Sequence, residues 1–307
     1  MKAINYQVSV NSISCFFEAS FFEIEKFVSK DRGIIITDTN VLHFHASKFE
    51  GWKIIVINAG EKFKQQATAD YIIGKLIELQ ADRDTIIIGI GGGVVTDISG
   101  YVASVYMRGL KLCLVPTSIL AMVDAAIGGK NGVDVGIYKN LVGSVAQPQY
   151  LIYDYEFLKS LPKVEWVNGF AEIIKHACIK DKELFKALEK DDINNIKNSP
   201  ALLDGLIQMN VNIKYGIVAR DEFEKGERRL LNFGHTIGHA IENLGNLSHG
   251  HAISIGMVAA CSISEKINKF SKTESLRIIA LLEKYELPIT MEFDILLRQS
   301  LPLLDIL

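Results

Sequence analysis

Short, nearly continuous apolar runs recur along the first half of the chain. Such runs are typical of parallel strands that are covered on both faces of a sheet. Between two of them, residues 64–80 place their apolar side chains at helical spacing. Strands that alternate with helices predict a doubly wound, Rossmann-like α/β domain. The predicted strands lie at 33–37, 52–57, 85–90, 111–116 and 150–154.

Strand signals fade after about residue 160, and signals of helix ends take their place. Ser199 is a suitable N-cap and Pro200 a suitable first helical residue. Ser271 and Glu274 have the spacing of a capping box, and Pro288 predicts the end of that helix. We therefore expect an α/β domain at 1–160 and an all-helical domain at 161–307, as the length of 307 residues allows.

The composition narrows the class of protein. With 49% hydrophobic and 22% charged residues it is typical of a soluble globular protein, and the net charge of −3 argues against nucleic acid as a partner. Neither an export signal nor a membrane span stands out, which predicts a cytoplasmic location. The four cysteines have no paired spacing, so we interpret them as free thiols.

A glycine-rich loop, GGGVVTD at 91–97, follows the predicted strand at 85–90 and precedes a helical pattern. Glycines let the backbone approach a ligand, and a helix start offers N–H groups to a phosphate. The loop departs from G-x-G-x-x-G at Val94, so a simple tight turn is the alternative. Two pairs of polar residues that follow earlier strands could also bind a nucleotide, or they could be solvated loop residues. These pairs are Asp38 with Asn40, and Glu61 with Lys64.

Residues 116–140 form a second glycine-rich run that charged and polar side chains interrupt. An unpaired buried charge is unfavourable, so charges in such a setting are usually paired or functional. Lysines and an asparagine among glycines suit an anionic, phosphorylated substrate. An irregular loop with surface lysines is the alternative. The side chains concerned are Asp124, Lys130, Asp134, Lys139 and Asn140.

Farther along, Arg228, Asn232, His235 and His239 have the spacing of one face of a single helix. A solvated face would usually carry Lys and Glu, so this row favours a binding site. Histidines at i and i+4 can also share one divalent metal, with a third ligand from elsewhere. Spacing alone does not rank the candidates for that ligand, which are Glu172, His176, His249 and His251.

Several blocks in this order resemble the 3-dehydroquinate synthase family over residues 30–290. They are GGGVVTD, MVDAAIGGKNGVD, YKNLVG, FLKSLP, GFAEIIK, ERRLLNFGHTIGHAIE and HGHAISIGM. The resemblance implies a homodimeric enzyme of the shikimate pathway that uses recycled NAD and a divalent metal, Zn²⁺ or Co²⁺. Its reaction converts 3-deoxy-D-arabino-heptulosonate 7-phosphate (DAHP) into 3-dehydroquinate and phosphate.

The same resemblance assigns roles to individual residues. It implies Glu172, His235 and His251 as metal ligands, and it leaves His249 and His176 without a role. The implied NAD-binding residues are Asp38, Asn40, Glu61, Lys64, Gly92, Gly93, Val94, Asp97, Thr117, Ser118, Lys139 and Ser160. The implied substrate and catalytic residues are Asp124, Lys130, Asn140, Lys175, Lys214, Glu224, Arg228, Asn232, His239 and, across the dimer interface, Arg108.

The chain departs from the family's pattern at its end. The tail MEFDILLRQSLPLLDIL lacks the lysine that the family places in its phosphate pocket, which predicts altered activity. Alternatives to a dehydroquinate synthase are another sugar-phosphate cyclase, of the 2-deoxy-scyllo-inosose or 2-epi-5-epi-valiolone synthase type, and a metal-dependent polyol dehydrogenase. A homologue that binds NAD or sugar phosphate without catalysis is an alternative of a different class.

Overall fold

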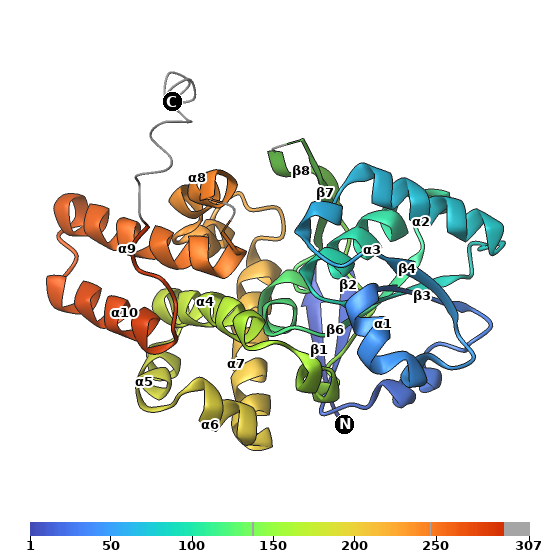
Figure 1. Cartoon of the computed structure of the whole chain (residues 1–307), viewed down its shortest axis with the longest axis horizontal. Coiled ribbons are helices and arrows are strands. Elements are labelled where there is room, and N and C mark those ends of the chain that lie inside the picture. Colours follow the sequence, from blue (N-terminus) through green and yellow to red (C-terminus); the bar gives the residue numbers. More distant parts are fainter. Residues whose placement is uncertain (137, 246, 292–307) are drawn as a thin grey trace. The chain divides into compact units, whose positions relative to one another are not determined.

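The structure is a computed structural model that describes residues 1–136, 138–245 and 247–291. The altered activity predicted from the missing lysine concerns the C-terminal tail, whose residues 292–307 lie outside the described residues. The chain forms two compact units (Figure 1). The first comprises residues 1–166 and 199–228, and the second comprises 167–198 and the chain from 229 onward.

The first unit is built on a seven-stranded sheet with the strand order β1-β2-β9-β6-β5-β3-β4. All neighbours are parallel except β1 and β2. The five strands expected from apolar runs are confirmed to within two residues, because their side chains are buried as a parallel sheet requires. The strands are β1 (Lys2–Val8), β2 (Asn11–Phe17), β3 (Gly33–Asp38), β4 (Lys53–Ile57), β5 (Ile86–Gly91), β6 (Lys111–Pro116) and β9 (Tyr150–Ile152).

Two strand pairs were not expected from the sequence. The β1–β2 hairpin begins with polar residues that alternate with apolar ones, so it has no continuous apolar run. The second pair, β7 (Lys130–Val135) and β8 (Tyr138–Val145), forms a separate antiparallel ribbon. It lies in the segment 116–140 and just beyond it, whose glycines and charges favour a loop by propensity. Residue 137, between these strands, lies outside the described residues.

The strand order places the candidate nucleotide residues at one edge of the sheet. Strand β4 lies on one side of β3 and β5 lies on the other, so the direction in which successive strands are added across the sheet reverses at β3. In open parallel sheets, ligands bind beyond the carboxyl ends of the strands at such a switch point. Asp38 ends β3, and Gly92 follows directly after β5. The buried Thr37 hydroxyl joins the two strands by donating to the Ile90 carbonyl at 2.8 Å.

Helices of the first unit are α1 (Thr39–His45), α2 (Gln66–Glu78), α3 (Gly93–Val105) and α7 (Pro200–Arg220). Ser199 caps α7 as expected, since its hydroxyl accepts from the Leu202 N–H at 3.4 Å. Helix α7 joins this unit because it packs against β1, where the rings of Tyr6 and Tyr215 stack at 4.3 Å. Residues 199–228 therefore lie with the α/β unit, although the boundary expected from the sequence was at 160.

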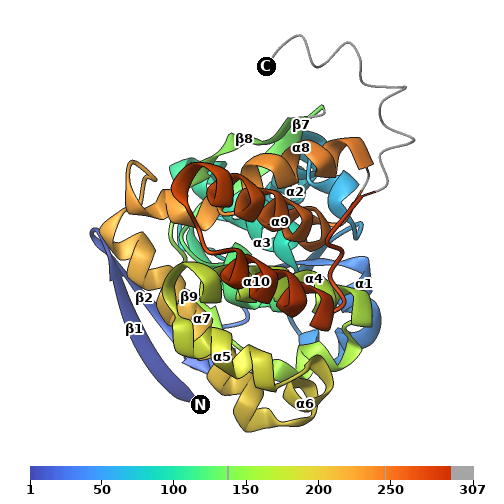
Figure 2. The ribbon, with the colours of Figure 1, turned by 90° about the vertical axis from the view of Figure 1, so that its left-hand side faces the viewer.

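The second unit is helical in all its described regular elements. Its helices are α5 (Lys182–Lys190), α6 (Ile193–Asn198), α8 (His235–Gly245), α9 (His249–Asn268) and α10 (Lys272–Lys284), together with most of α4 (Lys163–Lys180). Helix α9 packs against both α8 and α10 (Figure 2). Among the described residues, no helix is both long and apolar enough to span a membrane.

Candidate functional site

The glycine loop of the first unit joins the end of β5 to the first turn of α3. Gly92 is the N-cap of α3, so the N–H groups of the first helical turn point out of the loop. A Cβ atom at Gly92 would lie 3.5 Å from the Ser118 hydroxyl, and one at Gly93 would lie 3.5 Å from the Ala125 methyl. Both are ordinary van der Waals separations, and without these Cβ atoms the backbone of the loop is less covered, as the approach of a phosphate would need. Val94 follows in the first turn of α3, and the Thr117 N–H donates to Gly91 at 2.9 Å.

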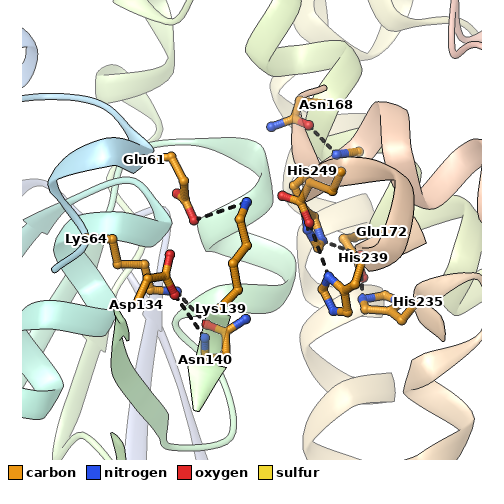
Figure 3. Close-up of polar contacts among 12 residues, drawn as sticks. Glu61, Lys64, Asp134, Lys139, Asn140, Asn168, Glu172, His235, His239 and His249 are labelled. Atoms are coloured by element: carbon orange, nitrogen blue, oxygen red, sulfur yellow. Dashed lines mark hydrogen bonds and ion pairs between the residues drawn. The ribbon is translucent and has the colours of Figure 1, made fainter. Parts of the chain in front are cut away.

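Lys64 is at the centre of a polar cluster in the same unit (Figure 3). Its ammonium lies 2.6 Å from the Asp97 carboxylate and donates to the Asn140 side-chain oxygen at 2.8 Å. The Asn140 N–H donates in turn to Asp134 at 2.9 Å. Burial alone would lower the pKa of Lys64, but Asp97 and Glu61 raise it above its usual value, so the ammonium stays charged.

Lys139 extends this cluster, with its ammonium 3.9 Å from the Glu61 carboxylate. The structure therefore gathers four of the residues assigned to NAD, and one assigned to substrate, around the ribbon β7–β8 and the loop after β4. They are Glu61, Lys64, Asp97, Lys139 and Asn140.

Two other residues assigned to NAD have local partners. Asp38 is the N-cap of α1 and accepts from the N–H groups of Asn40 and Val41 at 2.8 and 2.9 Å. Burial raises the pKa of Asp38 above its ordinary value, although both N–H groups oppose the rise. The Ser160 hydroxyl lies 2.7 Å from His45 Nε2, whereas Asn40 is exposed. These positions leave the assignment of Asp38, Asn40 and Ser160 to NAD as a prediction.

The cationic residues assigned to substrate in the first unit are held by specific contacts. Lys214 is buried and its ammonium lies 2.7 Å from both the Asp124 carboxylate and the Asp124 carbonyl. Lys130 forms an ion pair with Glu224. The buried guanidinium of Arg228 donates to the carbonyls of Gly128, at 2.9 Å, and Glu222. The structure thus fixes several cations in defined positions, as recognition of an anionic substrate requires.

The prediction that Arg228, Asn232, His235 and His239 share one helix face is wrong. A 3₁₀ helix at Glu227–Asn232 ends before α8 begins at His235. The break is at Gly234, whose φ of +82° belongs to the left-handed region that glycine favours. A Cβ there would also lie 2.6 Å from Met257 Cγ, because α9 crosses α8 closely at this point. Arg228 and Asn232 therefore lie on the 3₁₀ helix, and His235 and His239 lie on α8.

Glu172, His235 and His249 form a compact group of metal-ligating side chains in the second unit (Figure 3). One ligand atom from each lies within 4.8 Å of the other two. Glu172 Oε1 is 3.5 Å from His235 Nε2 and 3.2 Å from His249 Nε2, while its other oxygen pairs with the buried Lys175. Two imidazoles and one carboxylate form a set of donors that suits zinc.

The structure places His249, and not His251, in the groups of potential metal ligands found among the described residues of this unit. Both histidines are on α9, which begins at His249. Successive helical residues turn by about 100°, so side chains two apart point about 200° away from each other. In a regular helix the two histidine side chains would therefore leave α9 on opposite sides. The assignment of His251 remains a prediction, but the described geometry favours His249 in its place.

His249 also approaches a second carboxylate, that of Glu242, which the sequence interpretation did not include. Its Nδ1 lies 3.8 Å from Glu242 Oε2, and the same oxygen lies 3.1 Å from His239 Nδ1. Burial alone would lower the pKa of His249, but Glu172 and Glu242 raise it to about 9. The spacing of His239 and Glu242, three residues apart on α8, was the only signal for this residue in the sequence.

Close packing of α9 places His249 beside α4. The Gly250 N–H donates to the side-chain oxygen of Asn168, and a Cβ at Gly250 would collide with the Asn168 carbonyl. Gly250 therefore sets how closely the first turn of α9 approaches Glu172 on α4.

Gly250→Ala is expected to destabilise the metal-free protein by about 1–3 kcal/mol and to weaken zinc binding, because α9 must move away from α4. Gly205→Ala is the matched control, since an added Cβ there meets nothing within 4 Å inside α7. That control should be neutral or stabilising by up to about 1 kcal/mol. Chemical unfolding and zinc competition measure both effects. Equal behaviour of the two variants would contradict this view of the packing.

The remaining residues assigned by resemblance lie in separate places. Arg108 is exposed, next to Met107 and Gly109, and all three have positive φ. Asn232 is exposed at the end of its 3₁₀ helix. Their assigned roles, at a dimer interface and on the substrate, stay predictions.

Comparison with known proteins yields matches along most of the chain. The sequence model described as 3-dehydroquinate synthase N-terminal matches residues 54–168, and the one described as 3-dehydroquinate synthase C-terminal matches 169–305. The chain is 44% identical to the 3-dehydroquinate synthase of Prochlorococcus marinus strain AS9601 over 249 residues, which cover 79% of this chain and 68% of that protein. It is 40% identical to that of Pyrococcus furiosus, covering 85% and 78%.

A solved structure has the same fold. It is a 2-deoxy-scyllo-inosose synthase complexed with carbaglucose-6-phosphate, NAD⁺ and Co²⁺, and it superposes with a TM-score of 0.85 at 27% sequence identity. The match covers 97% of this chain and 86% of that chain.

Proposed function

The chain belongs to the 3-dehydroquinate synthase family, and we propose that it converts DAHP into 3-dehydroquinate and phosphate. The family consists of NAD- and metal-dependent carbon–oxygen lyases. The observation that carries the proposal is the group Glu172, His235 and His249, because its two imidazoles and one carboxylate suit the divalent metal that this reaction needs.

The two cofactors divide the chemistry of the reaction. When bound, the metal would polarise a ring hydroxyl and NAD would accept and later return its hydride. In this proposal Glu172, His235 and His249 hold the metal, while the glycine loop at Gly92 and the cluster around Lys64 hold NAD. This assigns NAD to the α/β unit and the metal to the helical unit.

The protein's own task is to hold a flexible polyanion in one reactive pose. DAHP carries a carboxylate and a phosphate, and charge-assisted hydrogen bonds to cations fix such groups. We assign this role to Lys130, Lys214 and Arg228, whose positions are set by carboxylates and carbonyls. Lys175, Asn232 and His239 complete the proposed substrate residues.

Release of inorganic phosphate from DAHP tests the function. We expect release by the purified protein with NAD and Zn²⁺, and none above background after the metal is stripped by a chelator. NADH should not accumulate, since the hydride returns to the intermediate. A build-up of NADH would instead indicate a polyol dehydrogenase. If the protein releases no phosphate from DAHP, the proposed function is wrong.

A second candidate, a different sugar-phosphate cyclase, is favoured by the solved relative that binds carbaglucose-6-phosphate. Glucose 6-phosphate in the same assay separates the two. DAHP has a carboxylate for the cations to bind, and glucose 6-phosphate has none. Turnover of glucose 6-phosphate in preference to DAHP would therefore replace our assignment.

Zinc binding is expected to tighten as the pH rises towards 9. Without metal, the pKa of His249 is about 9, so at neutral pH this imidazole carries a proton that zinc must displace. The apparent affinity should therefore increase ~10-fold per pH unit up to about pH 9, if one proton is released. Competition with a chelator of known proton affinity measures this. An affinity that is flat between pH 7 and 9 would contradict a protonated His249.

We further propose a homodimer in the cytoplasm, with Arg108 at the interface between the copies. The exposed position of Arg108 and of its neighbour Met107 supports this assignment. Sedimentation of the wild type and of Arg108→Ala tests the dimer.

A further inference from the structure

Glu242 is a buried carboxylate that the proposed reaction does not use. It lies in the middle of α8 with 6% of its surface exposed. Its Oε2 is 3.1 Å from His239 Nδ1 and 3.8 Å from His249 Nδ1, a hydrogen bond in the first case and an ion-pair separation in the second. A buried carboxylate is unfavourable without polar partners, and the two histidines are partners of this kind for Glu242.

Each nitrogen of the His249 ring has a carboxylate near it. Glu242 lies beside its Nδ1, and Glu172 lies 3.2 Å from its Nε2. A neutral imidazole carries its single proton on one nitrogen, and only the other nitrogen can bind a metal. The negative charge of Glu242 on the Nδ1 side favours a proton there, so Nε2, which lies 3.2 Å from Glu172 Oε1, is the nitrogen placed to bind a metal.

The same oxygen acts on His239. With its Nδ1 hydrogen-bonded to Glu242, the Nε2 of His239 remains for another partner. His239 and His249 come from different helices, and their ring centroids are 5.9 Å apart (Figure 3). One carboxylate can therefore orient both rings.

We propose that Glu242 is a positioning residue that fixes the Nδ1–H tautomer of His249, so that Nε2 binds the metal, and that it orients His239 in the same way. The inference rests on the proposed function, because it takes Glu172, His235 and His249 as the metal ligands. Outer carboxylates of this kind set the orientation of metal-binding histidines, and their loss typically weakens metal binding about 10- to 100-fold.

Zinc affinity of the metal-free protein, measured by chelator competition, tests this without any assay of turnover. Glu242→Gln keeps the size of the side chain but removes its charge, and we expect it to bind zinc about 10- to 100-fold more weakly. Glu189→Gln is the matched control, since Glu189 is on α5 of the same unit and pairs with Arg277 at 2.9 Å. It should bind zinc as the wild type does. Wild-type affinity in Glu242→Gln would overturn the proposal.

A second measurement needs no variant and so does not depend on how Glu242→Gln folds. NMR of zinc-loaded wild type with isotope-labelled histidine reports which nitrogen of each ring is protonated. We expect His249 with its proton on Nδ1 and zinc on Nε2, and the reverse would overturn the role of Glu242. If the wild type does not bind zinc through these histidines, the proposed metal site fails as well. Normal zinc binding with the opposite tautomer defeats only the inference about Glu242.

Discussion

His249→Ala is expected to lose zinc and more than about 100-fold of its activity, whereas His251→Ala should keep its zinc. His249 Nε2 lies 3.2 Å from Glu172 Oε1, in the same group as His235. Loss of an outer carboxylate already weakens metal binding about 10- to 100-fold, and loss of a direct ligand should exceed that. His251 lies two residues farther along α9, where helical geometry turns a side chain by about 200° from that of His249.

Metal content after gel filtration, measured by atomic absorption, compares the two variants directly. Glu172→Gln provides a positive control, since it replaces the carboxylate of the same group by a weaker ligand and should also lose zinc. The opposite pattern, with zinc lost from His251→Ala and retained in His249→Ala, would restore the assignment drawn from resemblance. It would also remove the observation that carries the proposed function.

The difference between these two histidines shows where sequence interpretation reaches its limit. The motif HGHAISIGM indicates that a histidine at the start of a helix matters, and the resemblance places the metal nearby. Which histidine faces Glu172 depends on where α9 begins and how it turns against α4. That rotation is set by Gly250 against Asn168 and by Gly256 against Gly234, contacts between segments far apart in the sequence.

The break before α8 has the same origin. Arg228, Asn232, His235 and His239 have ideal helical spacing, and nothing in that spacing shows that Gly234 has a φ of +82°. By contrast, the central strands β3, β5 and β6 were predictable because burial on both faces demands apolar residues at every position. Strands that follow other rules, such as β7 and β8 with their exposed valines and lysines, were not.

Lys64→Met is expected to destabilise the protein by about 3–5 kcal/mol at pH 7, the range for breaking a buried ion pair from one side. The Lys64 and Asp97 side chains are 7% and 18% exposed, and their charged atoms lie 2.6 Å apart. Without the ammonium, the Asp97 carboxylate would remain in a poorly solvated position. Lys62→Met is the matched control, because Lys62 is exposed two residues earlier and its loss should change stability by less than about 0.5 kcal/mol.

The pH dependence of this variant separates a lost charge partner from lost packing. Burial raises the pKa of Asp97, and Lys64 is the main group that opposes the rise, so the pKa should climb further in Lys64→Met. An acid whose pKa is higher in the folded state than in the unfolded state takes up a proton on folding, which makes folding more favourable as the pH falls. The deficit of Lys64→Met, measured by urea unfolding against wild type, should therefore shrink between pH 7 and pH 5. Adding Asp97→Asn should recover part of the loss at pH 7, since it removes the stranded charge. A deficit that is the same at both pH values and in the double variant would mean that Lys64 stabilises the unit through its methylene packing alone.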